Sequence, residues 1–271
     1  MAGHIITITS GKGGVGKTTT TANLGVALAS HNKKVAVVDA DIGLRNLDVV
    51  MGLENRIVYD LVDVVEGRCR LRQALIKDKR HPELALLPAA QTRDKNAVKP
   101  QEMAQLARDL AKEFDFVLID SPAGIEQGFR NAIAGASEVI IVTNPEVSAV
   151  RDADRIIGMV EAAELPTPRL ILNRVRADMI KRKEMMSVED VLEILAIDLI
   201  GVVPEDNSIV ISTNKGESVT HEKRSRAGLA YHNIARRIEG ETVPFLEVEN
   251  SDGFLGRLAS WFRGNRSGSS D

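Results

Sequence analysis

The chain has 271 residues, 44% of them hydrophobic, enough for one large α/β domain or two small ones with a sizeable core. Its 35 Lys and Arg nearly balance 38 Asp and Glu, so the net charge of -3 gives no general electrostatic reason to expect nucleic-acid binding. A single cysteine, Cys69, excludes an internal disulfide framework, and the lack of a leader-like start or a long apolar run indicates a soluble, non-secreted protein.

Short apolar runs rich in Val and Ile alternate along the chain with segments of helical period. The runs show no apolar/polar alternation, as expected for strands that helices cover on both faces of a parallel sheet. The expected strands are residues 4–9, 35–39, 84–88, 116–120, 139–143, 170–173 and 199–203, and the clearest helices are 18–30, 147–164 and 223–239. The pattern predicts a doubly wound, mostly parallel α/β sheet with helices on both faces.

The first expected strand leads directly into a glycine-rich loop that opens a helix. Residues 11–18 read GKGGVGKT and match the P-loop pattern G-x-x-x-x-G-K-[ST] in the structural context that this pattern requires. Its glycines let backbone N–H groups turn toward phosphate oxygens, Lys17 can reach the β- and γ-phosphates, and the Thr18 hydroxyl can ligate Mg²⁺. The loop predicts a nucleotide site. Lys12 is not required by the general pattern, and its spacing alone fits a solvated side chain equally well.

Three aspartates follow expected strands at their carboxyl ends, the edge of an open α/β sheet where ligands bind. They are Asp39 and Asp41 after one strand and Asp120 after another. Each could merely cap the next helix, but three together beside a P-loop favour a magnesium and catalytic role. We expect Asp41 to position the attacking water, and Asp39 and Asp120 to support the metal shell.

The identity of the base is less defined. The chain has no N-K-x-D sequence of the kind found in guanine-specific GTPases. Asn173 ends a late strand, and its amide offers both a donor and an acceptor to an adenine edge. A turn-forming asparagine at a strand end explains the same residue equally well.

The C-terminal region divides into three parts after Gly240. Residues 241–252 carry four acids, no base and a proline, and predict an extended acidic linker. In the next segment, 253–264, five apolar side chains fall within an arc of about 120° at helical spacing, namely Phe254, Leu255, Leu258, Trp261 and Phe262. Flanking arginines suit an amphipathic helix in a membrane interface, although a helix docked on the core is the alternative. Residues 265–271 predict a disordered tail.

Several segments together resemble the ParA/MinD family of deviant Walker A ATPases. The family's phosphate loop contains the additional lysine seen here as Lys12. The segments GLRNLD at 43–48, DSPAGIE at 120–126 and TNPEVSAVRDADRIIGM at 143–159 resemble more specifically its MinD-type members, which regulate the division site of bacteria and plastids. The similarity extends over nearly the whole chain.

This resemblance implies a slow, partner-stimulated, Mg²⁺-dependent ATPase that forms a homodimer on ATP. It also implies binding to an anionic membrane surface, recruitment of a MinC-like division inhibitor, release by a MinE-like ATPase activator, and no specific nucleic acid. The expected location is the cytoplasm and the inner face of the plasma membrane, or the stroma and inner envelope of a plastid. Lys12 would reach across the dimer to the phosphates of the partner's nucleotide.

The resemblance also assigns roles by position. The expected nucleotide-site residues are Gly11, Lys12, Gly13, Gly14, Val15, Gly16, Lys17, Thr18, Thr19, Asn173, Pro204, Glu205 and Asp206. The expected catalytic residues are Lys12, Lys17, Asp41 and Asp120, and the expected metal residues are Thr18, Asp39 and Asp120. The expected partner-binding residues are Arg45, Arg151, Asp152 and Asp154, although without the family the last three describe an ordinary amphipathic helix with a solvated charged face.

Two other classes share the phosphate loop. A ParA-like ATPase that partitions DNA would use the basic stretch 174–183, but the balanced charge and the apolar C-terminal segment argue against it. An iron–sulfur carrier needs cysteine pairs, which Cys69 alone does not supply. Cosedimentation with liposomes or with DNA would distinguish a membrane-binding ATPase from one that partitions DNA. An absorption spectrum would detect an iron–sulfur cluster.

Overall fold

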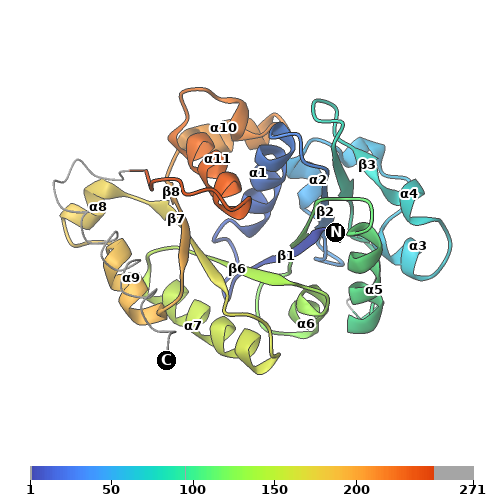
Figure 1. The fold of residues 1–271 in the computed structure, drawn as a ribbon, viewed down its shortest axis with the longest axis horizontal. Helices are drawn as coiled ribbons and strands as arrows, with labels where there is room; N and C mark the ends of the chain where they lie inside the picture. Colours follow the sequence, from blue (N-terminus) through green and yellow to red (C-terminus); the bar gives the residue numbers. More distant parts are fainter. Residues whose placement is uncertain (1, 95, 247–271) are drawn as a thin grey trace, which may run out of the picture.

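The computed structural model describes residues 2–94 and 96–246, so the predicted membrane-binding residues at 254–262 lie outside the described part. One sheet runs through the molecule (Figure 1). Its strands are β1 (His4–Thr9), β2 (Val35–Asp39), β3 (Ile76–Lys77), β4 (Leu84–Leu87), β5 (Phe116–Asp120), β6 (Glu138–Thr143), β7 (Arg169–Val175) and β8 (Leu199–Pro204). They lie in the order β3-β4-β2-β5-β1-β6-β7-β8, and every neighbouring pair is parallel except β3 with β4. The predicted doubly wound sheet is confirmed.

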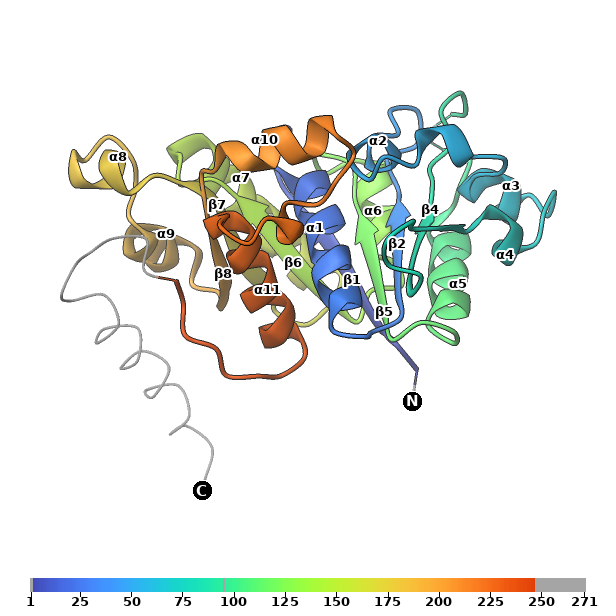
Figure 2. The same cartoon turned by 90° about the horizontal axis from the view of Figure 1, so that it is seen from above.

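Helices cover both faces of this sheet, as Figures 1 and 2 show. The helices are α1 (Lys17–Ser30), α2 (Leu47–Val50), α3 (Leu61–Val65), α4 (Leu71–Ala74), α5 (Pro100–Leu110), α6 (Gln127–Ile133), α7 (Val147–Ala162), α8 (Ala177–Lys181), α9 (Val188–Leu195), α10 (Asn207–Asn214) and α11 (Arg226–Ile238), with short 3-10 turns η1 (Glu54–Arg56) and η2 (Val219–His221). Helices α1 and α11 lie on one face, and α5, α6, α7 and α9 on the other. None of the described helices has the length and apolarity needed to span a bilayer.

The two-residue period of a strand explains why uninterrupted apolar runs suit this fold. In β2, Val35 and Val37 enter the core beneath α1, whereas Ala36 and Val38 enter the core beneath α5. Both sets are buried, so neither face of the strand tolerates a polar side chain. The hydrophobic pattern therefore predicts the strand but does not say which helix covers which face.

The chain reverses its direction of travel across the sheet at β1. From β1 it moves outward through β2 and returns to β5, which pairs with β1 on one side, and it then continues to β6, which pairs with β1 on the other. Such a reversal opens a crevice at the carboxyl end of the central strand. The glycine-rich loop leaves β1 at this point.

Most element boundaries differ from the expectation by only a few residues. The last helix, expected at 223–239, spans Arg226–Ile238, because the Ser225 hydroxyl accepts the Gly228 N–H at 3.0 Å and so caps the helix there. The two-residue strand β3 was not predicted. A strand of this length has too few residues to show a period.

The first six residues of the predicted linker, 241–246, lie against the end of α11 and the sheet. Arg237 in the last turn of α11 donates to the carbonyls of Ile200, Val243 and Pro244 at 2.8–3.0 Å. Its guanidinium also lies 4.1 Å from the centre of the Phe245 ring. Burial lowers the pKa of Arg237 to about 10, and the carbonyl oxygens take the place of an acidic partner.

Candidate functional site

The glycine-rich loop connects β1 to α1 and is packed closely against its neighbours. A Cβ atom on Gly11 would lie 2.3 Å from the carbonyl oxygen of Asp152 in α7. Gly16 has a φ of 100° and precedes α1, and a Cβ there would lie 2.3 Å from the side-chain nitrogen of Asn173. Gly11 therefore requires glycine for reasons of space, and Gly16 for reasons of both space and backbone conformation.

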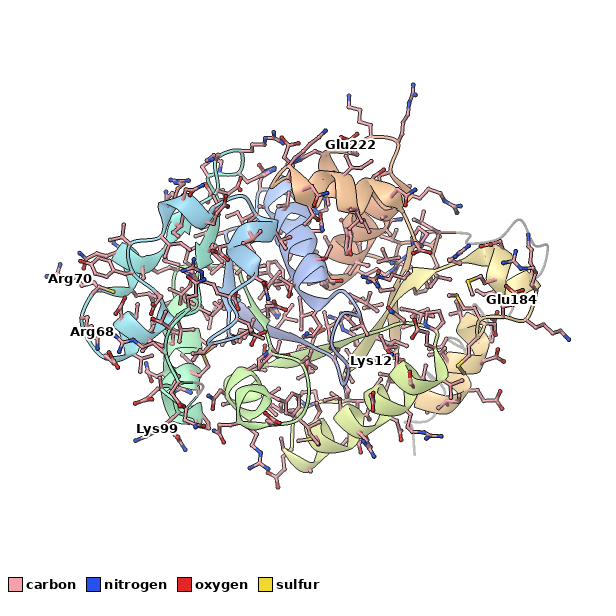
Figure 3. The ribbon with its side chains drawn as sticks, turned by 180° about the vertical axis from the view of Figure 1, so that it is seen from behind. Lys12, Arg68, Arg70, Lys99, Glu184 and Glu222 are labelled. Carbon is pink, nitrogen blue, oxygen red and sulfur yellow. The ribbon has the colours of Figure 1, made fainter. Side chains whose placement is uncertain are left out.

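The two lysines of the loop point to different places. Lys17, the first residue of α1, is only 8% exposed. It lies close enough to Asp120 for its charge to lower the pKa of that carboxyl group. Lys12 instead reaches over the surface to α7, where its ammonium lies 3.4 Å from a carboxylate oxygen of Glu146 and donates to the Ser148 hydroxyl at 3.2 Å. Lys12 is visible at the loop in Figure 3.

Asp120 ends β5 directly behind the loop and is 2% exposed. The hydroxyl of Thr21, one turn into α1, donates to its carboxylate at 3.3 Å. Burial and then the nearby charge of Asp39 raise the pKa of Asp120 to about 7, although Lys17 and the hydroxyls of Thr18 and Thr21 act in the opposite direction. Asp120 is thus a deeply desolvated carboxyl group with several polar neighbours on α1. Thr21 was not predicted as a site residue.

Asp39 ends the adjacent strand, in register with Asp120. One of its carboxylate oxygens accepts the Asp41 N–H at 2.9 Å, and the other accepts the N–H groups of Asn46 and Leu47, each at 3.1 Å. Burial raises the pKa of Asp39 to about 6 despite these bonds. The sequence allowed two roles for Asp39, a helix cap or a metal ligand, and these hydrogen bonds show the first. They also close the loop 41–46, which carries Asp41.

Asp39, Asp120 and Thr18 fit a magnesium site of the P-loop kind. Burial raises the pKa of both carboxyl groups, and the charge of Asp39 raises that of Asp120 further, so a divalent cation beside them would compensate charge that burial disfavours. No cluster of three His, Cys, Asp or Glu side chains with metal-binding geometry occurs within 2–94 and 96–246. A P-loop site does not need one, since a Ser/Thr hydroxyl and phosphate oxygens supply ligands there.

Asn173 lies against the phosphate loop and is 3% exposed. Its side-chain nitrogen donates to the carbonyl of Val15 at 2.8 Å, whereas its side-chain oxygen has no partner in the described part of the chain. Asn144, which was not predicted, approaches the same Val15 carbonyl at 3.2 Å once its amide is oriented to satisfy both of its atoms. The unpaired oxygen of Asn173 is a buried acceptor beside the loop, which suits the exocyclic amine of adenine.

The segment expected to lie along the adenine follows β8. The carboxylate of Asp206 accepts the Ser208 N–H at 2.8 Å and the Ser225 hydroxyl at 2.7 Å, so it caps α10 and ties the segment to the start of α11. Glu205 forms an ion pair with Arg176 at 3.4 Å, and Pro204 is buried at the end of the strand. The structure thus brings this segment to the same sheet edge as Asn173, since β7 and β8 are adjacent.

The expected partner-binding residues divide into two groups. Arg151 and Asp154 are exposed and Asp152 is half-buried on α7, the helix that also contacts Lys12 and Gly11. Arg45 behaves differently, because its side chain is only 19% exposed and its Nε lies 3.0 Å from Asp48, a residue that sequence reasoning did not single out.

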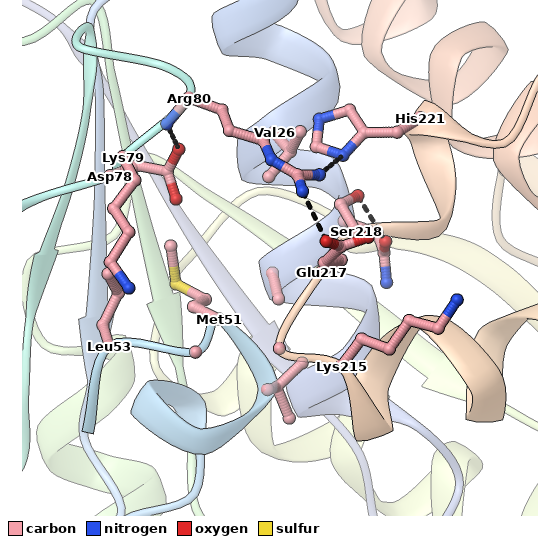
Figure 4. Close-up of a pocket in the computed structure, with 15 residues that line it drawn as sticks. Val26, Met51, Leu53, Asp78, Lys79, Arg80, Lys215, Glu217, Ser218 and His221 are labelled. Atoms are coloured by element: carbon pink, nitrogen blue, oxygen red, sulfur yellow. Dashed lines mark hydrogen bonds and ion pairs between the residues drawn. The ribbon is translucent and has the colours of Figure 1, made fainter. Parts of the chain in front are cut away.

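A cavity of about 170 Å³ lies beside α1, away from the phosphate loop, and was not predicted (Figure 4). At its rim Arg80 pairs with Glu217 and approaches Nδ1 of His221 at 3.2 Å. Nε2 of His221 lies 2.9 Å from Nε2 of His81. Because Arg80 can only donate, His221 must accept at Nδ1 and donate from Nε2, which keeps its ring neutral.

This arrangement predicts acid sensitivity. Burial, followed by the positive neighbours His81 and Arg80, lowers the pKa of His221 from its ordinary value of 6.5, although Asp78 and Glu217 oppose the shift. Below about pH 6.5 the unfolded chain takes up a proton that the folded protein resists, so the folded state loses stability as the pH falls. When the pH is lowered from about 7.5 to 5.5, we expect the Tm of His221→Gln to fall by less than the Tm of the parent protein. A variant at exposed His4, His4→Gln, serves as the control, and equal losses in all three proteins would contradict the prediction.

Comparison with known proteins supplies the family. Residues 6–219 match the CobQ/CobB/MinD/ParA nucleotide binding domain. The septum site-determining protein MinD of Bacillus subtilis is 55% identical over 263 residues, which cover 96% of this chain and 98% of that protein. In a MinC:MinD cell division complex from Aquifex aeolicus, one chain superposes with a TM-score of 0.84 at 47% identity, covering 90% of this chain and 99% of that one.

A more distant structure, MinD from Pyrococcus horikoshii complexed with Mg-ADP, has a TM-score of 0.79 at 32% identity and covers 87% of this chain and 96% of its own. The matches extend over both the phosphate loop and the rest of the sheet. The expected family resemblance is confirmed. The chain belongs to the CobQ/CobB/MinD/ParA nucleotide-binding family and, within it, to the MinD septum site-determining ATPases.

Proposed function

We propose that this chain is an ATP-driven switch that places the division septum by cycling between solution and membrane. In this proposal Mg-ATP binding drives homodimerisation, and the dimer attaches to the membrane and recruits a MinC-like inhibitor. Hydrolysis, stimulated by a MinE-like activator, then returns it to solution. The observation that carries the proposal is that the phosphate loop packs between Asp120 and Asn173, while the side chain of its Lys12 is directed away, to the start of α7.

The chain's own residues divide the work of binding. Backbone N–H groups of the loop 11–18 and the ammonium of Lys17 would hold the phosphates, and the free oxygen of Asn173 would accept from the base. Thr18, Asp39 and Asp120 would hold Mg²⁺, directly or through water, and the ion would neutralise charge that develops on the phosphates. A relative whose structure contains Mg-ADP supports the binding of a magnesium nucleotide.

Hydrolysis requires a water aligned with the terminal phosphate. Asp41 follows Asp39 at the sheet edge, and its backbone is fixed by the bond between its N–H and the Asp39 carboxylate. We assign to the Asp41 side chain the orientation of the attacking water. Because the Asp41 side chain meets the water and not the bound phosphates, it contributes to turnover and not to affinity.

Lys12 links hydrolysis to assembly in this proposal. Its present contacts, Glu146 and Ser148, leave the Lys12 side chain 42% exposed, so little is lost when it moves to another anion. Reaching the phosphates of a second protomer would give it a stronger, charge-assisted partner. The neighbouring face of α7, with Arg151, Asp152 and Asp154, is the proposed surface for the inhibitor and the activator. The MinC:MinD complex of a relative supports a MinC-like partner.

Membrane attachment is assigned to residues 253–264, from their sequence pattern. Interfacial burial of one short helix is offset by the cost of ordering it, so a single copy binds weakly. Two copies in one dimer raise the apparent affinity by ~10²–10⁴ without a new contact. Nucleotide state would thereby set location, cytoplasmic for the monomer and peripheral at the membrane for the dimer.

The described structure gives the DNA-partition alternative little support. Two of the three arginines in the basic stretch 174–183 are held in ion pairs, since Arg176 pairs with Asp178 and Glu205, and Arg182 pairs with Asp178 and Glu184. Nucleic-acid affinity depends on cations that can replace counterions at phosphates.

Replacing Asp41 tests the catalytic part of the proposal. We expect Asp41→Ala to bind ATP with unchanged affinity but to hydrolyse it at least about 100-fold more slowly, because the water loses its orienting group. The dimer should then persist and accumulate on liposomes. A phosphate-release assay with liposomes and activator measures the rate, and parental turnover in the variant would leave Asp41 with only a local backbone role.

A further inference from the structure

Asp48 is a buried acid that the proposed reaction does not use. It lies in the short helix α2, its side chain is 0% exposed, and neither of its carboxylate oxygens forms a hydrogen bond within the described residues. Its compensation is the ion pair with Arg45, whose Nε lies 3.0 Å from one carboxylate oxygen. A buried carboxylate with a single charged neighbour depends on that neighbour strongly.

Arg45 makes this contact from an unusual backbone conformation. Its φ is 36°, in the left-handed region that an arginine rarely occupies. The N–H groups of Leu44 and Arg45 both donate to the carbonyl of Asp41, at 3.2 and 3.1 Å, which closes a tight turn. The turn aims the Arg45 side chain inward at Asp48 and away from solvent.

The loop that carries Asp41 is therefore fixed at both ends by buried carboxylates. Asp39 holds Asp41, Asn46 and Leu47 through their N–H groups. Asp48 holds Arg45, whose own N–H is bonded to the Asp41 carbonyl. A shift of Arg45 would be transmitted to Asp41 through a single turn.

We propose that Arg45 and Asp48 form a positioning pair that holds Asp41 in its hydrolytic orientation, and that Arg45 influences partners through this loop and not as a direct contact. The proposal rests on the proposed function, because it gives Asp41 the task of orienting water. It also differs from the family expectation, which placed Arg45 on the partner-binding surface.

The proposed pair predicts how variants rank in the kcat of basal ATP hydrolysis, measured without inhibitor or activator. Arg45→Ala leaves the Asp48 charge buried and unpaired, so kcat should fall about 10–100-fold with KM unchanged. Asp48→Asn removes the charge and keeps the volume, and Arg45 can then turn to solvent, so its loss should be smaller. The double variant should hydrolyse ATP faster than Arg45→Ala alone. Arg45→Lys should fall between the parent and Arg45→Ala.

The rescue by Asp48→Asn distinguishes this pair from a partner contact, which cannot change turnover when no partner is present. Arg72→Ala is the matched control, since Arg72 forms an exposed ion pair with Glu113 remote from the loop and should leave kcat unchanged. Parental kcat in Arg45→Ala, or losses in the two single variants that simply add in the double variant, would overturn the proposal.

A second measurement does not depend on turnover. Amide hydrogen exchange at residues 41–47 should accelerate in Arg45→Ala and slow again in the double variant, with nucleotide affinity retained. If Arg45→Ala does not fold, the proposal is tested with Asp48→Asn alone. This variant should show a lower kcat, an unchanged KM and faster amide exchange in the loop 41–47. Unchanged exchange in every variant would overturn the pair. A parent protein without any ATP hydrolysis would instead overturn the proposed function, and the exchange experiment would still report on the loop.

Discussion

Lys17→Ala abolishes ATP binding at concentrations that saturate the parent protein, and with it the ATP-dependent attachment to membranes. Lys17 is 8% exposed at the start of α1, so the buried ammonium faces the place where the phosphates would lie. Its removal takes away a charge-assisted contact and leaves Asp120 without its nearest cation, which makes the pocket more repulsive to an anion. We expect the dissociation constant to rise by at least about 100-fold, corresponding to roughly 3 kcal/mol.

A titration with a fluorescent ATP analogue measures this loss, and Lys12→Ala is its control. The Lys12 side chain points to Glu146 and Ser148 at the start of α7, so its replacement should leave nucleotide binding by the monomer intact while preventing the ATP dimer. Undiminished ATP affinity in Lys17→Ala would reject the phosphate role of Lys17. A normal ATP-dependent dimer of Lys12→Ala in analytical ultracentrifugation would reject the role of Lys12 across the dimer.

Trp261→Glu detaches the ATP-bound dimer from anionic liposomes, whereas Ser260→Glu has a much smaller effect. The two residues are adjacent, but helical spacing places Trp261 within the arc of the apolar face and Ser260 on the opposite side. A carboxylate on the apolar face costs several kcal/mol when it is desolvated, and in a dimer the penalty applies twice. Binding of Trp261→Glu should therefore fall by more than about tenfold.

Cosedimentation with liposomes measures both variants against the parent chain, with ATP-driven dimerisation as the check that the body is intact. Equal losses in the two variants, or none in either, would contradict an in-plane helix. A lower Tm of Trp261→Glu in the absence of membranes would indicate that the segment docks on the core, which was the alternative that the sequence left open.

The sequence predicted the sheet well because each strand is buried on both faces and so appears as an unbroken apolar run. Residues 35–39 and 116–120 were predicted with the boundaries that the structure has. The two-residue β3 was missed. The pattern predicted that the other strands form a parallel sheet, but not the order in which they lie. The order itself depends on which strands pair, and local sequence carries no information on pairing.

The candidate site was predictable where a motif fixes both residue type and position. The loop 11–18 and the acids at strand ends are of this kind. The roles of Asn144, Asp48 and Thr21 were not, because each depends on a neighbour far away in the chain or on the direction of one side chain. Asp39 shows the limit most clearly, since its three backbone partners across residues 41–47 are visible only in the folded loop.

Liposome sedimentation of the parent chain with ATP, with ADP and without nucleotide tests the central claim most directly. The proposed switch predicts that most of the protein pellets with anionic liposomes in ATP and stays in the supernatant in the other two conditions. Equal sedimentation in all three conditions would contradict the claim that nucleotide state controls location.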